Sequence, residues 1–137
     1  MFVFDSNVLV EFLRGRLPQG LELLNNTDTR LVKIPAIVQA ELLMGAYKSA
    51  QSERNAAAVE SLICNFEVLP FDSLCARAYA RIRSDLEKDG MKIDPNDLII
   101  AATALAHGAT LVTYNVDEFK RVPGLRILSI YEVDFPG

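Results

Sequence analysis

The chain has 137 residues, of which half are hydrophobic and 23% are charged, and its formal net charge at pH 7 is −4. This length and composition predict a single globular domain over residues 1–137, with enough apolar side chains for a sizeable core. The acidic balance excludes a polycationic protein that simply coats a nucleic-acid duplex, but it is compatible with an enzyme that holds RNA through metal ions and a local basic patch.

Targeting and membrane signals are absent from the sequence. The opening run Met1-Phe2-Val3-Phe4-Asp5 has no basic region of a signal peptide, and no apolar run reaches the roughly 18 residues of a membrane span. We therefore expect a cytoplasmic protein without a membrane partner. Cys64 and Cys75 have no metal-ligand spacing, so we expect buried free thiols. His107 is the only histidine, which excludes a His-rich zinc site and favours a helix-end role.

Short apolar runs alternate with helical segments along the chain. The sequence predicts strands at residues 2–5, 31–34, 66–69 and 110–113, and a fifth at 127–130 after the loop 114–126. It predicts helices at residues 8–13, 18–25, 35–47, 52–64, 73–88 and 95–107. This alternation predicts a three-layer α/β/α fold with a central, mostly parallel sheet of four to five strands. Ligands of such sheets bind outside the carboxyl ends of the strands.

The first strand ends at a carboxylate, Asp5, which Ser6 and Asn7 follow. Asp is common as a helix cap, and capping is the simplest interpretation of Asp5. However, Ser6 or Asn7 can cap the next helix equally well, so the cap does not require Asp5. The predicted position of Asp5 is the sheet edge where ligands bind.

Glu41 lies in the predicted helix 35–47 with apolar neighbours on its own face. Ile37, Val38 and Met44 are three or four residues from Glu41 and therefore lie above and below it on the helix. Two interpretations are about equally good: an edge glutamate that extends into water, or an inward carboxylate that needs a partner.

The segment around Asp97 has the clearest helix signals of the chain. Asp94 suits the N-cap, Pro95 the first helical position, and Gly108 the C-terminal stop. Residues 98–106 are apolar except for Thr103, which predicts a buried helix with Asp97 in its first turn. Asp97 can serve a capping-box role toward Asp94, but a buried carboxylate otherwise needs a partner because an unpaired charge is costly.

The fourth strand leads into a polar loop that contains Asn115, Asp117 and Glu118, and a solvated surface turn is the simplest interpretation of each residue alone. Taken together with Asp5, Glu41 and Asp97, the loop brings several carboxylates toward one crevice. They cannot all ionise comfortably there without a cation. Oxygen ligands alone indicate Mg²⁺ or Mn²⁺ rather than zinc, and such an ion suits phosphoester hydrolysis.

Four stretches of the sequence resemble the PIN-domain ribonucleases of the VapC toxin type. They are Phe4-Asp5-Ser6-Asn7, Glu41-Leu42-Leu43-Met44-Gly45, residues 95–102 and residues 111–125. The last stretch begins with Leu111-Val112-Thr113-Tyr114-Asn115. Each stretch is a weak signal alone, but four in this order and at these separations are specific.

The resemblance implies a PIN fold and a set of site residues. Asp5, Glu41 and Asp97 would bind Mg²⁺ (or Mn²⁺), with Asp5 and Asp97 as the primary ligands. Ser6 and Asn7 would orient Asp5 or a bound water, and Asn115 would support the cluster. Asn115, Asp117 and Glu118 are all candidates for the fourth acidic position, and Asp117 is our choice as the fourth catalytic residue; this choice bears on whether a second ion binds.

The resemblance also implies an activity and partners. It implies endoribonuclease action on single-stranded or looped RNA, a place in a type II toxin–antitoxin pair, a homodimer, and a VapB-type antitoxin that covers the site, often with a basic side chain among the carboxylates. Basic residues that would hold the RNA backbone include Arg14, Lys120 and Arg121, with Arg16 and Lys48 as further candidates, although each alone is most simply a solvated charge.

Two other functions are compatible with the same pattern. One is a catalytically inactive PIN-like module that binds RNA or protein, against which the joint presence of three acids argues. The other is a phosphotransfer protein or phosphatase on a similar α/β fold. A phosphatase of the haloacid dehalogenase type needs Asp-x-Asp, where this chain has Asp5-Ser6-Asn7, and a receiver needs a phosphoacceptor after the third strand, where Asp72 looks like a helix cap.

Overall fold

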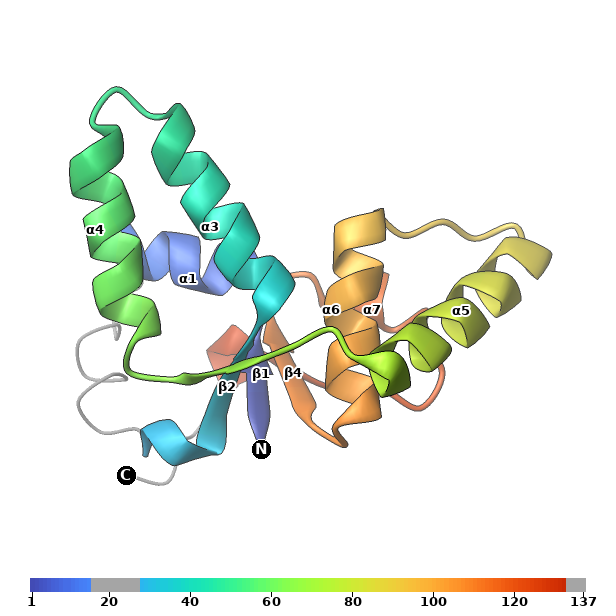
Figure 1. Cartoon of the computed structure of the whole chain (residues 1–137). Coiled ribbons are helices and arrows are strands. Elements are labelled where there is room, and N and C mark those ends of the chain that lie inside the picture. Colours follow the sequence, from blue (N-terminus) through green and yellow to red (C-terminus); the bar gives the residue numbers. More distant parts are fainter. Residues whose placement is uncertain (16–27, 133–137) are drawn as a thin grey trace.

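The computed structural model describes residues 1–15 and 28–132, and its centre is a sheet of five parallel strands (Figure 1). The strand order is β3-β2-β1-β4-β5, with β1 in the middle. The α/β class and the parallel sheet are therefore confirmed, including the fifth strand. The strands are β1 Phe2–Phe4, β2 Val32–Pro35, β3 Glu67–Leu69, β4 Thr110–Thr113 and β5 Arg126–Ser129.

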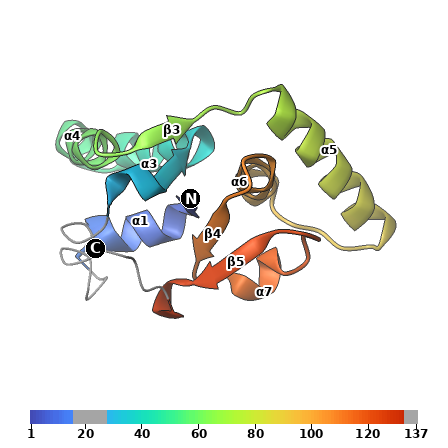
Figure 2. The ribbon, with the colours of Figure 1, turned by 90° about the horizontal axis from the view of Figure 1, so that it is seen from below.

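Helices lie on both sides of these strands. In Figures 1 and 2, α3 and α4 lie next to α1 on one side, and α5 and α6 lie on the other. The helices are α1 Ser6–Leu13, α3 Ala36–Lys48, α4 Ser52–Ile63, α5 Ser73–Lys88, α6 Pro95–Ala106 and α7 Val116–Phe119, with 3₁₀ turns at Thr29–Leu31 and Ile130–Glu132. None of the helices in the described ranges is long and apolar enough to cross a bilayer.

The core forms where the central strands meet α6. Val3, Ile34 and Leu111 are fully buried, as expected for parallel strands that are covered on both faces. Most of the apolar stretch of α6 is buried as predicted, although Ile99, Leu105 and Ala106 are partly exposed. The Thr103 hydroxyl donates to the carbonyl of Ile99 at 2.7 Å, so this polar group is satisfied inside the helix. This packing fixes α6 against the middle of the sheet.

Several sequence expectations need correction. Cys64 is exposed rather than buried, because it follows the last residue of α4 and lies beyond that helix's apolar face; Cys75 is buried as expected. The loop 114–126 contains the short helix α7, whose Phe119 is buried. Four residues are too few for a helical periodicity to be visible in the sequence. The helix predicted at residues 18–25 lies outside the described residues.

Candidate metal-binding active site

Asp5 stands at the carboxyl end of β1 and is held by two other segments. It caps α1: the backbone N–H of Asn7 donates to its Oδ1 at 2.8 Å. The Thr113 hydroxyl, at the end of β4, donates to its Oδ2. Asp5 is only 4% exposed. The simplest interpretation of Asp5, a helix cap, is therefore confirmed, and the alternative caps Ser6 and Asn7 are not used. One carboxylate both caps the helix and presents its charge at the sheet edge.

Thr113 is a site residue that the sequence analysis missed. Its side chain is fully buried, and its Oγ1 also accepts the backbone N–H of Asn115 at 2.9 Å. The hydroxyl therefore connects the first strand to the loop after the fourth. The available signal was a polar residue at the end of a buried strand. Using this signal requires knowing that β4 pairs with β1, and the sequence does not show the strand order.

Glu41 is held from two directions. The Ser6 hydroxyl donates to its Oε1 at 2.6 Å, and the Asn96 amide donates to its Oε2 at 3.5 Å. These contacts place the partly buried Glu41 at the edge where α1, α3 and α6 converge, so the interpretation as an inward carboxylate is the better one. The Ser6 hydroxyl thus contacts Glu41, whereas Asn7 contacts Asp5 through its backbone and has an exposed side chain. Their expected role in orienting Asp5 or a bound water stays a prediction.

Asp97 and Glu118 form the other half of the cluster. The pKa of Asp97 is raised to about 7, first by burial, then by its hydrogen bond with Glu118 and by the negative charges of Glu118, Asp94 and Asp5. The Asn115 amide in turn donates to Glu118. Asp117, our choice for the fourth acid, is exposed. The structure therefore brings Glu118 to Asp97 and Asn115 to Glu118, and the supporting role of Asn115 stays a prediction.

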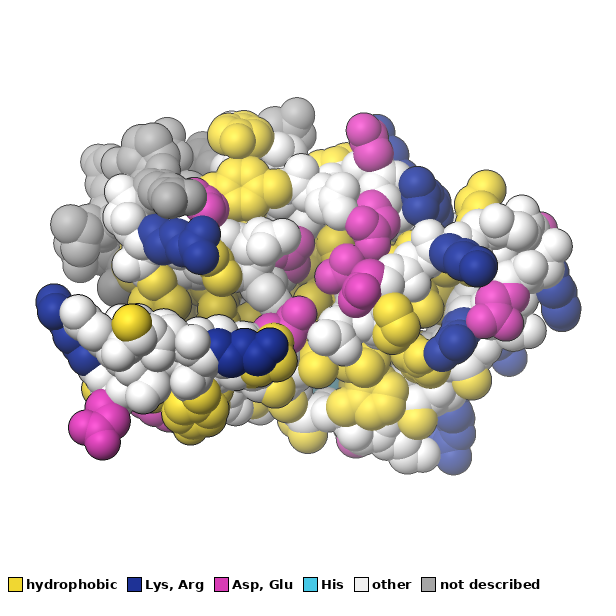
Figure 3. Space-filling view, turned by 90° about the horizontal axis from the view of Figure 1, so that it is seen from above, with side chains coloured by type: hydrophobic (Ala, Val, Ile, Leu, Met, Phe, Trp, Pro, Cys, Tyr) yellow, Lys and Arg dark blue, Asp and Glu magenta, His cyan; other side chains and the backbone are white. Residues whose placement is uncertain are grey.

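The electrostatics of the cluster are those of crowded acids. The pKa of Asp5 is also raised, mainly by burial and further by the charge of Glu41, against the opposing effect of its hydrogen bonds from Thr113, Asn7 and Val8. Within the described ranges, the ion pairs join Arg30, Lys33 and Arg83 to other acids, so no basic side chain there neutralises the cluster. Figure 3 shows the face of the molecule seen from above Figure 1, with acidic side chains near its middle and Lys and Arg side chains around them.

The donor set fits a hard divalent cation. It consists of oxygen atoms, which Mg²⁺ and Mn²⁺ prefer. In the described part of the chain, no three carboxylates bring one oxygen each within 4.8 Å of one another, so the cluster is open. Mg²⁺ commonly uses one or two carboxylates and keeps several waters, and this spacing suits that mode. A bound cation would also relieve the repulsion that raises the pKa of Asp97.

A groove of about 290 Å³ adjoins the cluster between α1, α3 and α4. Val10, Leu42 and Val59 give it apolar walls, and Glu41 and Arg14 lie at its polar part. Of the other basic residues singled out in the sequence, Lys48, Lys120 and Arg121 are exposed, and the Arg121 guanidinium donates to the carbonyl of Lys92 at 2.9 Å. Arg16 lies outside the described residues.

Comparison with known proteins agrees with this geometry. The PIN domain family matches residues 2–125. The chain is 37% identical to Ribonuclease VapC2 of Rickettsia felis over 129 residues, covering 91% of this chain and 94% of that relative. It is 36% identical to the tRNA(fMet)-specific endonuclease VapC of Salmonella typhimurium over 126 residues, covering 92% and 95%.

Solved structures are equally similar. A chain in the crystal structure of DNA-bound VapBC from Salmonella typhimurium matches with a TM-score of 0.88 at 36% identity, covering 93% of this chain and 96% of that one. A chain of VapBC2 from Rickettsia felis, bound to a DNA fragment from their promoter, matches with a TM-score of 0.83 at 35% identity, covering 93% and 97%.

Proposed function

The chain belongs to the PIN-domain family and, within it, to the VapC-type ribonucleases, and from this premise we propose that it is a divalent-metal-dependent endoribonuclease, the toxin of a type II toxin–antitoxin pair. One observation carries the proposal. Asp5, Glu41, Asp97 and Glu118 converge at the carboxyl edge of the sheet, and the pKa of Asp97 is raised to about 7 by burial and by its acidic neighbours. Such a cluster suits a cation and the chemistry of phosphodiesters.

The metal we propose is Mg²⁺, with Mn²⁺ as a substitute that uses the same ligands. Asp5 and Asp97 would hold it, and Glu41 and Glu118 would complete the acidic set, with Glu118 in the fourth position instead of Asp117. When bound, such an ion lowers the pKa of a water and stabilises negative charge on the phosphate and the leaving oxygen.

The surrounding residues position this acidic set. Thr113 and the Asn7 backbone fix both oxygens of Asp5, so its orientation does not depend on the ion. Ser6 and Asn96 hold Glu41 through separate oxygens, and Asn115 holds Glu118. Such support keeps the carboxylates close to a productive geometry and reduces the rearrangement needed when substrate binds.

The substrate we propose is single-stranded or looped RNA. Arg14, Lys120 and Arg121 are exposed, and in this proposal they contact RNA phosphates individually, despite the net charge of −4. Two relatives bear the name tRNA(fMet)-specific endonuclease. Initiator tRNA is therefore the first RNA to test.

The partner we propose is a small VapB-type antitoxin, since several of the similar solved structures are VapBC complexes. The groove beside Glu41 supports this proposal, because an antitoxin segment in it would lie next to the acidic cluster and bring a basic side chain within reach. We further propose that the chain forms a homodimer and acts in the cytoplasm.

RNA cleavage by the purified protein without antitoxin tests the proposal. Total RNA and initiator tRNA are incubated with Mg²⁺, with Mn²⁺ and with EDTA, and Asp97→Asn is compared with Asp85→Asn, a change of the same kind at an exposed position on α5. We expect discrete fragments that require metal, that Asp85→Asn still makes, and that Asp97→Asn loses.

The opposite outcomes point to the two other functions. A folded wild-type protein that binds RNA but leaves it intact under every metal condition would favour a catalytically inactive binding module. Release of phosphate from small phosphoesters without RNA cleavage would favour a phosphatase.

A further inference from the structure

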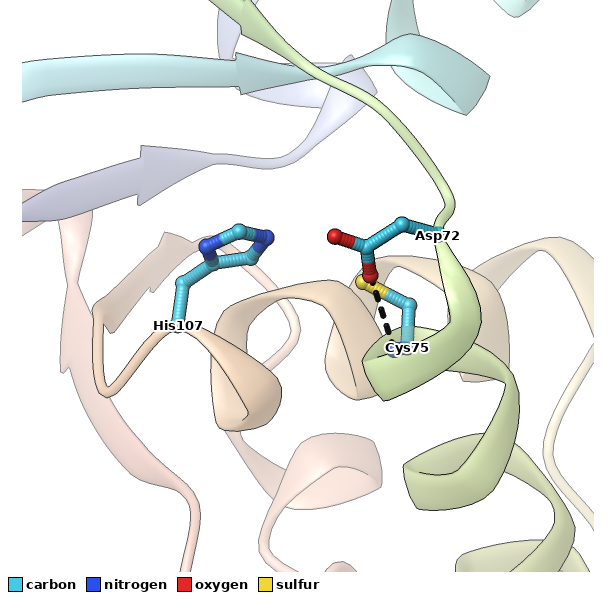
Figure 4. A group of neighbouring side chains, drawn as sticks. All are labelled: Asp72, Cys75 and His107. Carbon is cyan, nitrogen blue, oxygen red and sulfur yellow. Dashed lines mark hydrogen bonds between the residues drawn. The ribbon is translucent and has the colours of Figure 1, made fainter.

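A second group of metal-ligand side chains lies at the other end of α6. Asp72 caps α5, Cys75 follows within the first turn of that helix, and His107 is the C-cap of α6. One ligand atom from each side chain lies within 4.8 Å of the other two. Figure 4 shows the imidazole ring directed toward Asp72, with the sulfur of Cys75 beside them. Because α5 packs on α6, residues 32 positions apart meet here, which explains why the sequence spacing showed no metal site.

His107 has an unsatisfied nitrogen in this group. Its Nε2 is buried and has no hydrogen-bond partner, and it is the only such side-chain atom among the described residues. A buried polar atom without a partner is costly, and native proteins rarely contain one without a reason. An imidazole nitrogen that carries no proton is a good ligand for transition metals.

The other two side chains also have capacity for a ligand. The Cys75 thiol is fully buried and makes only weak bonds: it lies 3.7 Å from the carbonyl of Pro70 and also contacts the side chains of Asp72 and Thr103. Burial raises the pKa of this thiol, so it is a neutral donor in the absence of a cation. Asp72 uses Oδ1 to accept the backbone N–H of Cys75 at 3.1 Å, and Figure 4 shows its second oxygen facing His107. Asp72 can therefore bind a metal without giving up its capping bond.

We propose that Asp72, Cys75 and His107 form a binding site for Zn²⁺ or a similar borderline transition metal, separate from the carboxylate cluster. A nitrogen, a sulfur and an oxygen ligand are the set that Zn²⁺ accepts, and Mg²⁺ does not favour it. On binding, the thiol proton passes to solvent as the metal–sulfur bond forms, and His107 binds through Nε2 while Nδ1 keeps the ring proton.

The geometry needs only a small adjustment. Tetrahedral zinc with bonds of about 2.0–2.3 Å places its ligand atoms roughly 3.3–3.7 Å apart. The three ligand atoms lie within 4.8 Å of one another, so the group must close by at most about 1.5 Å. Asp72 is exposed and free to turn by that amount, and its solvent side leaves the fourth position to water. The bound metal would tie the start of α5 to the end of α6.

The site does not depend on the proposed ribonuclease activity. Asp97 and His107 are ten residues apart on α6, which is about 15 Å along a helix axis. A metal at the His107 end is therefore not shared with the carboxylates. The two proposals can fail independently, because Asp97→Asn affects only the carboxylate cluster and His107→Asn affects only the second site.

Titration of the whole chain with Co²⁺ and Zn²⁺ tests the proposal. Cobalt bound to a thiolate gives a charge-transfer absorption in the near ultraviolet, and carboxylate-bound cobalt does not. We expect this band at one equivalent of Co²⁺ in the wild type and its loss when Zn²⁺ is added. Cys75→Ser should abolish the band, and His107→Asn should weaken Zn²⁺ binding by about tenfold or more, since even the loss of an outer partner costs about 10–100-fold.

Two matched variants serve as controls. Cys64→Ser removes the exposed cysteine that follows α4, and Asp97→Asn disables the carboxylate cluster; both should keep the band and the Zn²⁺ affinity. The proposal is overturned if the wild type shows no thiolate band, if Cys64→Ser removes it, or if His107→Asn binds Zn²⁺ as tightly as the wild type. Circular dichroism checks folding, and His107→Asn decides the question if Cys75→Ser does not fold.

Discussion

The two ends of α6 present two different kinds of site. Its first turn carries Asp97 among like charges, all of them oxygen ligands, and the pKa of Asp97 is raised to about 7 by that environment. Its last residue is followed by His107, which meets a thiol and a carboxylate and has an unsatisfied nitrogen. The first arrangement suits a hard cation that keeps its waters, and the second suits a borderline metal. Donor chemistry, more than acidity alone, therefore distinguishes the sites.

The largest expected effect comes from Asp5. Asp5→Asn should lower the metal-dependent cleavage rate by about 100-fold or more, since metal ligands contribute several kcal/mol to catalysis. It should keep the cap of α1, because an amide oxygen can still accept from Asn7. Asp5→Ala should lose the same activity and also about 1 kcal/mol of stability. Single-turnover cleavage and urea unfolding separate these effects, and an active Asp5→Asn would remove Asp5 from the ligand set.

Glu118 and Asp117 allow a direct choice of the fourth acid. Glu118→Gln should lower cleavage at pH 7.5 by roughly tenfold and shift the pH midpoint of activity downward, because the neighbour that raises the pKa of Asp97 loses its charge. Asp117→Asn should change the rate by less than about twofold, since Asp117 is exposed. The reverse ranking would restore Asp117 to the fourth position.

Thr113 should affect activity only by positioning Asp5. Thr113→Val keeps the volume but removes the hydroxyl that donates to Asp5 and accepts from Asn115, so we expect about 1–2 kcal/mol of lost stability and a weaker metal affinity. Thr113→Ser keeps a hydroxyl, so the Mg²⁺ concentration for half-maximal cleavage should return to the wild-type value. If Thr113→Val titrates with Mg²⁺ like the wild type, the Asp5 bond has no part in metal binding.

The smallest effect is a pH dependence of stability in the metal-free protein. The pKa of Asp97 is about 7 in the folded chain and near 3.8 when unfolded, so the folded state holds the extra proton between these values. Its contribution is complete below about pH 4 and is lost as the pH rises through 7. Because Asp97 is partly exposed, we expect a change on the order of 1 kcal/mol.

Unfolding midpoints at pH 5 and pH 8 measure this effect. Asp97→Asn should reduce the difference between them, and Mg²⁺ should raise the midpoint of the wild type at pH 8. A wild-type protein that is more stable at pH 8 than at pH 5 without metal would contradict the raised pKa.

Much of the fold could be predicted, because the strands of a covered parallel sheet are continuous apolar runs and α6 is punctuated by Asp94, Pro95 and Gly108. The strand at residues 110–113 was predicted with its observed bounds. Helix α7 could not be predicted, since four residues show no periodicity.

The candidate site divides in the same way. Asp5, Glu41 and Asp97 could be selected from local surroundings and from family resemblance. The contacts of Thr113 with Asp5 and of Ser6 with Glu41 join residues 108 and 35 positions apart, so they depend on strand order and helix packing. Glu118 and Asp117 are neighbours in sequence, and only the direction of a short helix separates the partly buried acid from the exposed one.

The most direct test of the account is Mn²⁺ binding, followed by electron paramagnetic resonance at pH 7.5 and compared with RNA cleavage on the same samples. We predict that binding and cleavage reach half-saturation at the same Mn²⁺ concentration, that Asp97→Asn loses both, and that Asp85→Asn and His107→Asn keep both. Mn²⁺ binding that survives Asp97→Asn, or cleavage that proceeds in EDTA, would contradict the claim that this carboxylate cluster holds the metal for catalysis.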